Sequence, residues 1–144
     1  HIGTFRGHQV AMAAGLAAIQ FMEEVDLAAH AASLGELTLG LLREAQDTLP
    51  SFGDVRGRGL MIGIELVSDR DTKAPWPEMA AQIRTECFRK GVIIEVGGHY
   101  GNVARFLPPL VITPELMLRG VEIFVESVRA AEEALARPAV LLAG

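Results

Sequence analysis

The spacing of apolar residues changes in the middle of the chain, and that change constrains the fold more than any other feature. Between Gln9 and Leu49 the residues favour helices. From Leu60 to Val67, leucine and isoleucine instead recur at every second position, which is the period of a strand with one buried face. A helical pattern returns after Thr113. Helices followed by a small group of strands and then by another helix predict an α+β fold.

The first helical region divides into two predicted helices. The first, Gln9 to Glu24, is rich in alanine and apolar on nearly every side, which is typical of a buried helix. Asp26 can cap a second helix through its carboxylate. The inward face of that helix is predicted to carry Leu27, His30, Leu34, Leu37 and Leu41. We interpret His30 as a structural histidine of this face.

The predicted strands are short. Besides the strand from Leu60, we expect strands at 92–96 and 103–107, joined by a glycine-rich turn, and an extended continuation at 110–112. Together they predict a small, mostly antiparallel sheet of about three to four strands with helices against one face.

Two more helices accompany the strands. A polar loop at 68–77 leads into a short amphipathic helix that ends at Gly91. Thr113, Pro114 and Glu115 are the residue types of a helix start. The last helix is predicted to bury Leu116, Gly120, Ile123, Phe124, Ser127, Val128, Ala131 and Leu135.

Charge and cysteine content argue against several function classes. The net charge is −5 and the chain has no basic run, so we expect no nucleic-acid partner. The one cysteine, Cys87, excludes an internal disulfide and suits a reducing compartment. Apolar stretches fall short of the roughly 18 residues of a membrane span, and the start of the chain has no signal-peptide pattern. We therefore expect a cytoplasmic protein with no membrane partner.

Most common catalytic motifs are missing. Gly57, Gly59 and Gly63 only partly match a dinucleotide fingerprint and lead into a strand, so we interpret them as allowing a turn and a close backbone approach. The four histidines show no metal-ligand spacing. Cys87 lies on an apolar helix face and is interpreted as a packing residue.

Two places could bind an anion. Thr4 lies in a glycine-rich lead into a helix N-terminus, where a phosphate would be stabilised, although an ordinary helix cap explains the residues equally well. Arg105 lies between apolar residues of a predicted strand and needs a negative partner. That partner is either a substrate carboxylate, which a guanidinium binds through two hydrogen bonds, or an internal acid such as Glu65 or Glu95.

Three sequence blocks carry a family resemblance. They are GTFRG at 3–7, followed by an alanine-rich helix, RGRGLMIGIE at 56–65, and GNVARFLPPLVIT at 101–113. In this order they resemble the C-terminal region of class III, pyridoxal-phosphate-dependent aminotransferases, over residues 3 to about 135. Within the class, the first and third blocks are most similar to diaminobutyrate–2-oxoglutarate aminotransferases; 4-aminobutyrate and ornithine aminotransferases are more distant.

The resemblance assigns roles to two residues. It implies that Thr4 binds the phosphate of the partner subunit's pyridoxal phosphate in a homodimer, and that Arg105 holds a carboxylate of the amino acid or 2-oxo acid substrate. One departure is His8, which stands where the family usually has asparagine. Neither Thr4 nor Arg105 is affected by it.

The family mechanism also needs a lysine that forms a Schiff base with the cofactor. This chain has two lysines, Lys73 in a polar loop and Lys90 at a helix end, and both are predicted to be solvated. We therefore expect a C-terminal segment of a longer enzyme, inactive alone and belonging with its own large domain. Residues 1–136 are predicted as the small domain of a fold-type I enzyme, with 1–25 as the connecting helix and 137–144 as a tail. The alternative from another class is a non-catalytic α+β binding or assembly module.

Overall fold

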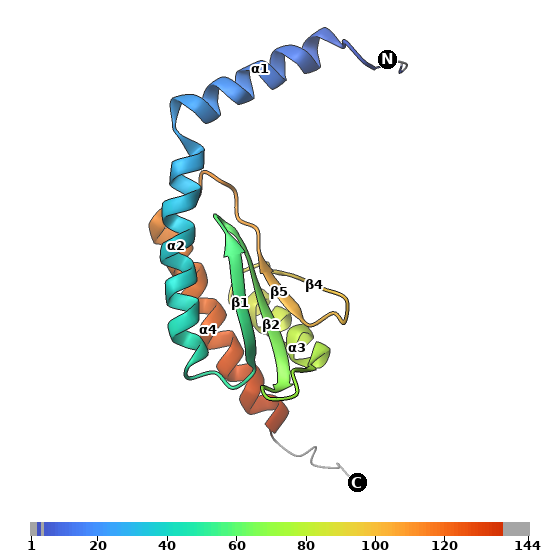
Figure 1. Cartoon of the computed structure of the whole chain (residues 1–144), viewed down its shortest axis with the longest axis vertical. Helices are drawn as coiled ribbons and strands as arrows, with labels where there is room; N and C mark the ends of the chain where they lie inside the picture. The colour runs from blue at the N-terminus through green and yellow to red at the C-terminus, as the bar shows by residue number, and fades with distance from the viewer. Residues whose placement is uncertain (1–2, 4, 137–144) are drawn as a thin grey trace.

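The structure is a computed structural model that describes residue 3 and residues 5–136. Its elements, shown in Figure 1, are α1 (Gln9–Glu24), α2 (Leu27–Gln46), β1 (Phe52–Arg58), β2 (Met61–Asp69), β3 (Ala74–Pro75), α3 (Pro77–Arg89), β4 (Glu95–Gly97), β5 (Val103–Phe106) and α4 (Pro114–Ala136). The predicted tail at 137–144 lies outside the described residues.

The five strands form one antiparallel sheet. Its order is β1-β2-β5-β4, and the two-residue β3 pairs with the end of β2. Helices α2, α3 and α4 lie on one side of it (Figure 1), which confirms the predicted α+β architecture. The sheet has five strands instead of the expected three to four, because β1 was not predicted and β3 forms inside the predicted polar loop. The expected extended segment at 110–112 is wrong: the Ile112 N–H donates to the Pro109 carbonyl at 3.0 Å and closes a turn.

The core lies between the sheet and its helices. Alternate residues of β2, namely Ile62, Ile64 and Leu66, are buried on the helical side, as their two-residue spacing predicts. The Phe124 ring of α4 packs edge-on against Phe106 of β5, with ring centroids 5.0 Å apart. The opposite face of the sheet has no helix over it in the described part of the chain.

The capping predictions for the helices are confirmed. The Ala29 N–H donates to Asp26 Oδ1 at 3.3 Å at the start of α2. At the start of α4, the Leu116 N–H donates to Thr113 Oγ1 at 3.4 Å. Both contacts satisfy amide groups that a helix N-terminus leaves without partners.

The predicted inward faces are partly wrong. In α2, Leu37 is exposed, and the buried side includes Leu39 and Leu42. In α4, Leu116 and Leu135 are exposed, because the buried stripe begins at Met117 and ends at Ala131. The buried residues of α4 are Met117, Val121, Ile123, Phe124, Ser127, Val128 and Ala131.

Helix α1 does not pack as its composition predicts. None of its residues is buried, and large apolar side chains such as Met12, Leu16 and Ile19 are more than half exposed. The chain turns at Val25, and α1 runs away from the sheet (Figure 1). The predicted burial is therefore wrong within the described residues, where α2 is the one helix or strand that α1 contacts. No described helix is long and apolar enough to cross a membrane.

Two glycines bring α2 against the turn between β1 and β2. A Cβ atom on Gly35 would lie 2.7 Å from the Cα atom of Gly59 and closer still to its carbonyl group. Gly59 has a φ of +54°, in the left-handed region that favours glycine. The predicted close backbone approach at Gly59 is confirmed, and it holds the first hairpin against the helical layer.

Candidate functional site

Arg105 lies on the face of the sheet that has no helices over it. Its neighbours in β5, Ala104 and Phe106, are buried on the helical side, so alternation turns Arg105 outward. In the sheet register it stands opposite Gly63 of β2 and Glu95 of β4.

The guanidinium of Arg105 forms an ion pair and is still partly exposed to solvent. Nη2 lies 3.0 Å from Glu95 Oε2, and the two side chains are 44% and 61% exposed. Of the two internal acids considered from the sequence, Glu95 pairs with Arg105. Exposed ion pairs contribute only about 0–1 kcal/mol. A ligand carboxylate could therefore replace Glu95 at low cost.

Gly97 makes room for this arginine. A Cβ atom on Gly97 would lie 2.9 Å from Nη2 of Arg105, so the guanidinium rests directly over the bare backbone of β4. The strand that supplies Glu95 therefore also supplies the platform for the guanidinium.

A hollow of about 620 Å³ lies beside the ion pair. Glu95 and Arg105 are the charged residues that line it. The remaining lining comes from residues 91–94 before β4, from Phe106 and the loop after β5, and from α4, and includes Ile93, Leu107 and Pro108. Its volume is within the range of small-molecule sites, and its few polar groups are concentrated at the arginine.

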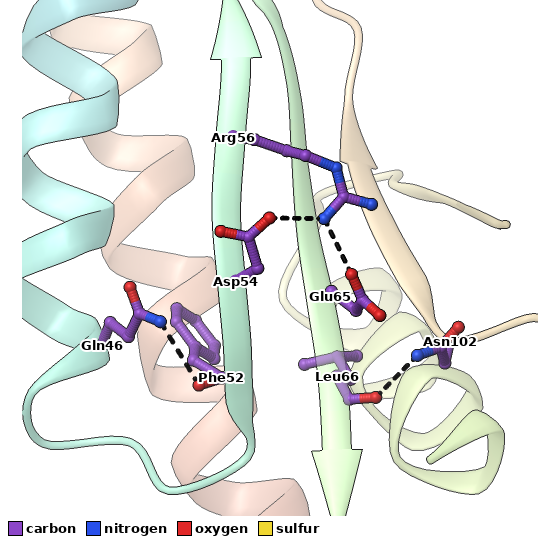
Figure 2. A network of polar contacts seen from close by, with 7 residues as sticks. All are labelled: Gln46, Phe52, Asp54, Arg56, Glu65, Leu66 and Asn102. Carbon is purple, nitrogen blue, oxygen red and sulfur yellow. Dashed lines mark hydrogen bonds and ion pairs between the residues drawn. The ribbon is translucent and has the colours of Figure 1, made fainter. Parts of the chain in front are cut away.

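Two buried or half-buried contacts hold β5 and the loop that follows it. The Asn102 side chain is buried, and its Nδ2 donates to the Leu66 carbonyl at 2.9 Å (Figure 2). His30 Nε2 donates to the Ile112 carbonyl at 2.9 Å, in agreement with its interpretation as structural. The sequence analysis missed Asn102; the available signal was an asparagine directly between the glycine-rich turn and a predicted strand.

Arg56 of β1 is a second outward-facing arginine. Its Nη1 donates to Asp54 Oδ2 at 2.7 Å and to Glu65 Oε2 at 2.8 Å (Figure 2). The hydrogen bonds to Asp54 and then to Glu65 raise the pKa of the Arg56 guanidinium. The sequence analysis included Arg56 in a family-like block and gave it no role of its own.

The predicted N-terminal anion site precedes α1 in the chain. Thr4 lies outside the described residues, so its predicted phosphate contact stays a prediction. Helix α1 begins with His8 as its cap, whose Nδ1 accepts the Ala11 N–H at 3.3 Å. His8 therefore performs at this helix start the capping role that asparagine side chains commonly perform.

The remaining reactive side chains have ordinary environments. Lys73 and Lys90 are both exposed, and Lys90 Nζ lies 3.1 Å from Glu126 Oε2. Cys87 is buried, which raises the pKa of its thiol and confirms its interpretation as a packing residue. Across residue 3 and residues 5–136, no group of three or more His, Cys, Asp or Glu side chains is arranged to hold a metal.

Comparison with known proteins identifies the family. The family profile described as "Aminotransferase class-III" matches residues 1–128. The chain belongs to the class III aminotransferases. Family membership confirms the resemblance seen in the sequence and favours a transaminase segment over a module unrelated to transaminases.

Individual class III relatives are similar over much of this chain. A diaminobutyrate–2-oxoglutarate aminotransferase of Haemophilus influenzae is 44% identical over 113 residues, which are 74% of this chain and 25% of the relative. A 4-aminobutyrate aminotransferase of Mycobacterium leprae is 43% identical over 121 residues, covering 84% of this chain and 27% of the relative. The chain thus spans about a quarter of the length of these relatives.

Solved structures agree with the family assignment. The structure of a Bacillus anthracis aminotransferase superimposes with a TM-score of 0.84 at 34% sequence identity, covering 90% of this chain and 30% of that one. The described residues place no lysine in a buried pocket where a Schiff base with pyridoxal phosphate would be protected from water. Neither lysine therefore fits the covalent attachment site of the cofactor.

Proposed function

We propose that this chain is the C-terminal segment of a pyridoxal-phosphate-dependent transaminase in which Arg105 holds a substrate carboxylate. The amino donor would be 2,4-diaminobutyrate, reacting at its terminal amine, and the acceptor 2-oxoglutarate. The observation that carries the proposal is the outward-facing, half-exposed guanidinium of Arg105 beside a mostly apolar hollow. The similarity to diaminobutyrate–2-oxoglutarate aminotransferases supports the choice of donor.

The role of Arg105 follows from guanidinium chemistry. A planar guanidinium can donate two parallel hydrogen bonds to one carboxylate, which fixes the carboxylate's orientation as well as its position. Gly97 leaves the guanidinium room to lie flat on β4. A substrate carboxylate would exchange with Glu95, which holds the side chain near this orientation when no substrate is bound.

The rest of the complete enzyme would supply the remaining chemistry. Bound pyridoxal phosphate provides the electron sink for the amino transfer. From this chain, Thr4 would bind the cofactor phosphate of the partner subunit in a homodimer. We also propose that residues 1–136 form the small domain, with 1–25 as its connection to the large domain, and that the enzyme works in the cytoplasm. The bare apolar surface of α1 would then pack against the large domain.

The donor assignment can be tested with the full-length enzyme. We expect kcat/KM for 2,4-diaminobutyrate to exceed the values for 4-aminobutyrate and ornithine by about tenfold or more, measured as glutamate formed from 2-oxoglutarate. A higher value for 4-aminobutyrate would replace the donor assignment, and the 43% identity to a 4-aminobutyrate aminotransferase makes that the second candidate. Glutamate formation with none of the three amines would contradict the proposed function.

The isolated 144-residue chain should not attach the cofactor covalently. Both lysines are exposed, so water can hydrolyse any imine that they form. Pyridoxal phosphate added to the chain is therefore expected to give no stable imine absorbance band. The matched variants are Lys73→Arg and Lys90→Arg, which keep each charge. A stable band that either variant abolishes would contradict the prediction.

A further inference from the structure

We propose that His30 of α2 is a positioning residue for the substrate site. Through its hydrogen bond to the Ile112 carbonyl it fixes the loop at 107–113, which forms one wall of the hollow beside Arg105. This inference rests on the proposed function, because it takes that hollow to be the place where a substrate lies. His30 touches no substrate itself and acts through the loop.

The 107–113 loop lies next to Arg105 in the chain and in space. One residue, Phe106, separates Arg105 from the start of the loop. Residues 107–109 and Ile112 line the same hollow of about 620 Å³ as Arg105 does. When Arg105 holds a carboxylate, the rest of the ligand lies against this apolar wall. The position of the loop therefore affects how well a substrate fits.

The loop has little of its own to hold it in place. Pro108 and Pro109 have no N–H group and cannot donate a hydrogen bond. The large apolar side chains of Leu107, Leu110 and Val111 are exposed, so their burial adds little. Inside the loop, a turn is closed by the hydrogen bond from the Ile112 N–H to the Pro109 carbonyl, at 3.0 Å. A contact from outside the loop should therefore contribute much to its position.

His30 supplies such a contact. Its Nε2 donates to the Ile112 carbonyl at 2.9 Å, which is the usual length of an N–H···O hydrogen bond, and the contact is half-buried. Because the Ile112 N–H closes the turn, both backbone polar groups of Ile112 are engaged. Figure 1 shows the segment between β5 and α4 running up to the start of α2, where His30 lies.

The turn of α2 that carries His30 is itself held in place. The His30 N–H donates to the Asp26 carbonyl at 3.1 Å, and Asp26 also caps the helix. A Cβ atom on Gly59 would lie 3.5 Å from the carbonyl oxygen of Ala31, so the helix meets the β1–β2 turn directly beside His30. His30 therefore ties the loop to a part of the helical layer that the first hairpin already fixes.

Two variants of similar size separate the hydrogen bond from the packing of the side chain. His30→Gln keeps an N–H donor at the end of the side chain, whereas His30→Met has a similar length and no donor. In the full-length holoenzyme, we expect His30→Met to raise the KM for 2-oxoglutarate about fivefold, the factor that one ordinary hydrogen bond corresponds to, with kcat within twofold. Both constants should stay within twofold in His30→Gln.

A second measurement follows the loop in the absence of substrate. Hydrogen–deuterium exchange of the amides at 110–113 should become about fivefold faster or more in His30→Met and stay unchanged in His30→Gln, because the turn opens more often without its anchor. The matched control on the same helix is Ser33→Ala. Ser33 is exposed, and its hydroxyl donates to the Ala29 carbonyl of α2 itself, so this variant should change neither KM nor exchange.

The outcomes separate this inference from the proposed function. An unchanged KM in His30→Met, an equal rise in His30→Gln, or unchanged exchange at 110–113 each overturns the positioning role of His30. A raised KM in Arg105→Gln would still leave the role of Arg105 intact, whereas an unchanged KM in Arg105→Gln contradicts the proposed function itself. If His30→Met fails to fold, His30→Asn replaces it with the same expectations, because the shorter side chain does not reach the Ile112 carbonyl.

Discussion

Replacing Arg105 by glutamine in the full-length enzyme is expected to raise the KM for 2-oxoglutarate about 100-fold. Glutamine retains a hydrogen-bond donor but loses the charge and the paired donors of the guanidinium. Losing a bidentate, charge-assisted contact costs about 2–3 kcal/mol, which corresponds to a factor of roughly 30 to 150. The measurement is steady-state kinetics with 2-oxoglutarate varied at a saturating concentration of the amino donor.

Two companion observations make the Arg105 test specific. Arg105→Lys keeps the charge without the planar fork and should give an intermediate KM. The thermal unfolding midpoint of Arg105→Gln should stay close to that of the unsubstituted enzyme, because the pair with Glu95 is largely exposed and contributes little to stability. An unchanged KM together with a lowered midpoint would show that Arg105 is a structural residue.

The second large effect concerns stability and lies on the other side of the sheet. Gly35→Ala would place a Cβ atom 2.7 Å from the Cα of Gly59 and closer to its carbonyl group, all of which belong to the backbone. Relief requires α2 to move away from the β1–β2 turn. Such overpacking costs about 1–3 kcal/mol. The thermal unfolding midpoint of the full-length enzyme is therefore expected to fall by about 1–3 °C.

The same helix provides a control. Gly40 also lies in α2, and a Cβ atom added there meets nothing within 4 Å. Gly40→Ala should leave the unfolding midpoint unchanged or raise it, because alanine favours helix by about 0.5–1 kcal/mol over glycine. A midpoint of Gly35→Ala that matches that of Gly40→Ala would mean that the helix and the turn are not in close contact.

The sequence predicted the elements that show a clear apolar period or a capping residue of their own. The alternation from Leu60 to Leu66 gave the central strand β2 and its buried side. The capping residues Asp26 and Thr113 marked helix starts that the structure confirms. Strand β1 was not predicted, because its glycines and charged residues follow no apolar period and it is held in place by pairing with β2.

The candidate site was also predictable in part: the sequence indicated Arg105 but gave Arg56 no role. Arg105 was found because a charge within an apolar run needs a partner, and Glu95 was one of the two acids considered. Arg56 was missed because its neighbours on the outer face come from the register of a hairpin whose first strand was unrecognised. Likewise, the composition of α1 indicates an apolar helix but does not specify which surface covers it.

The alternation of side chains along β5 has a practical consequence for engineering. Ala104 and Phe106 are buried towards the helices, whereas Arg105 between them faces outward. A library intended to change substrate preference can therefore be confined to outward positions on this sheet, such as 56, 63 and 105. Substitutions at 104 and 106 would instead disturb the packing of the core and lower stability.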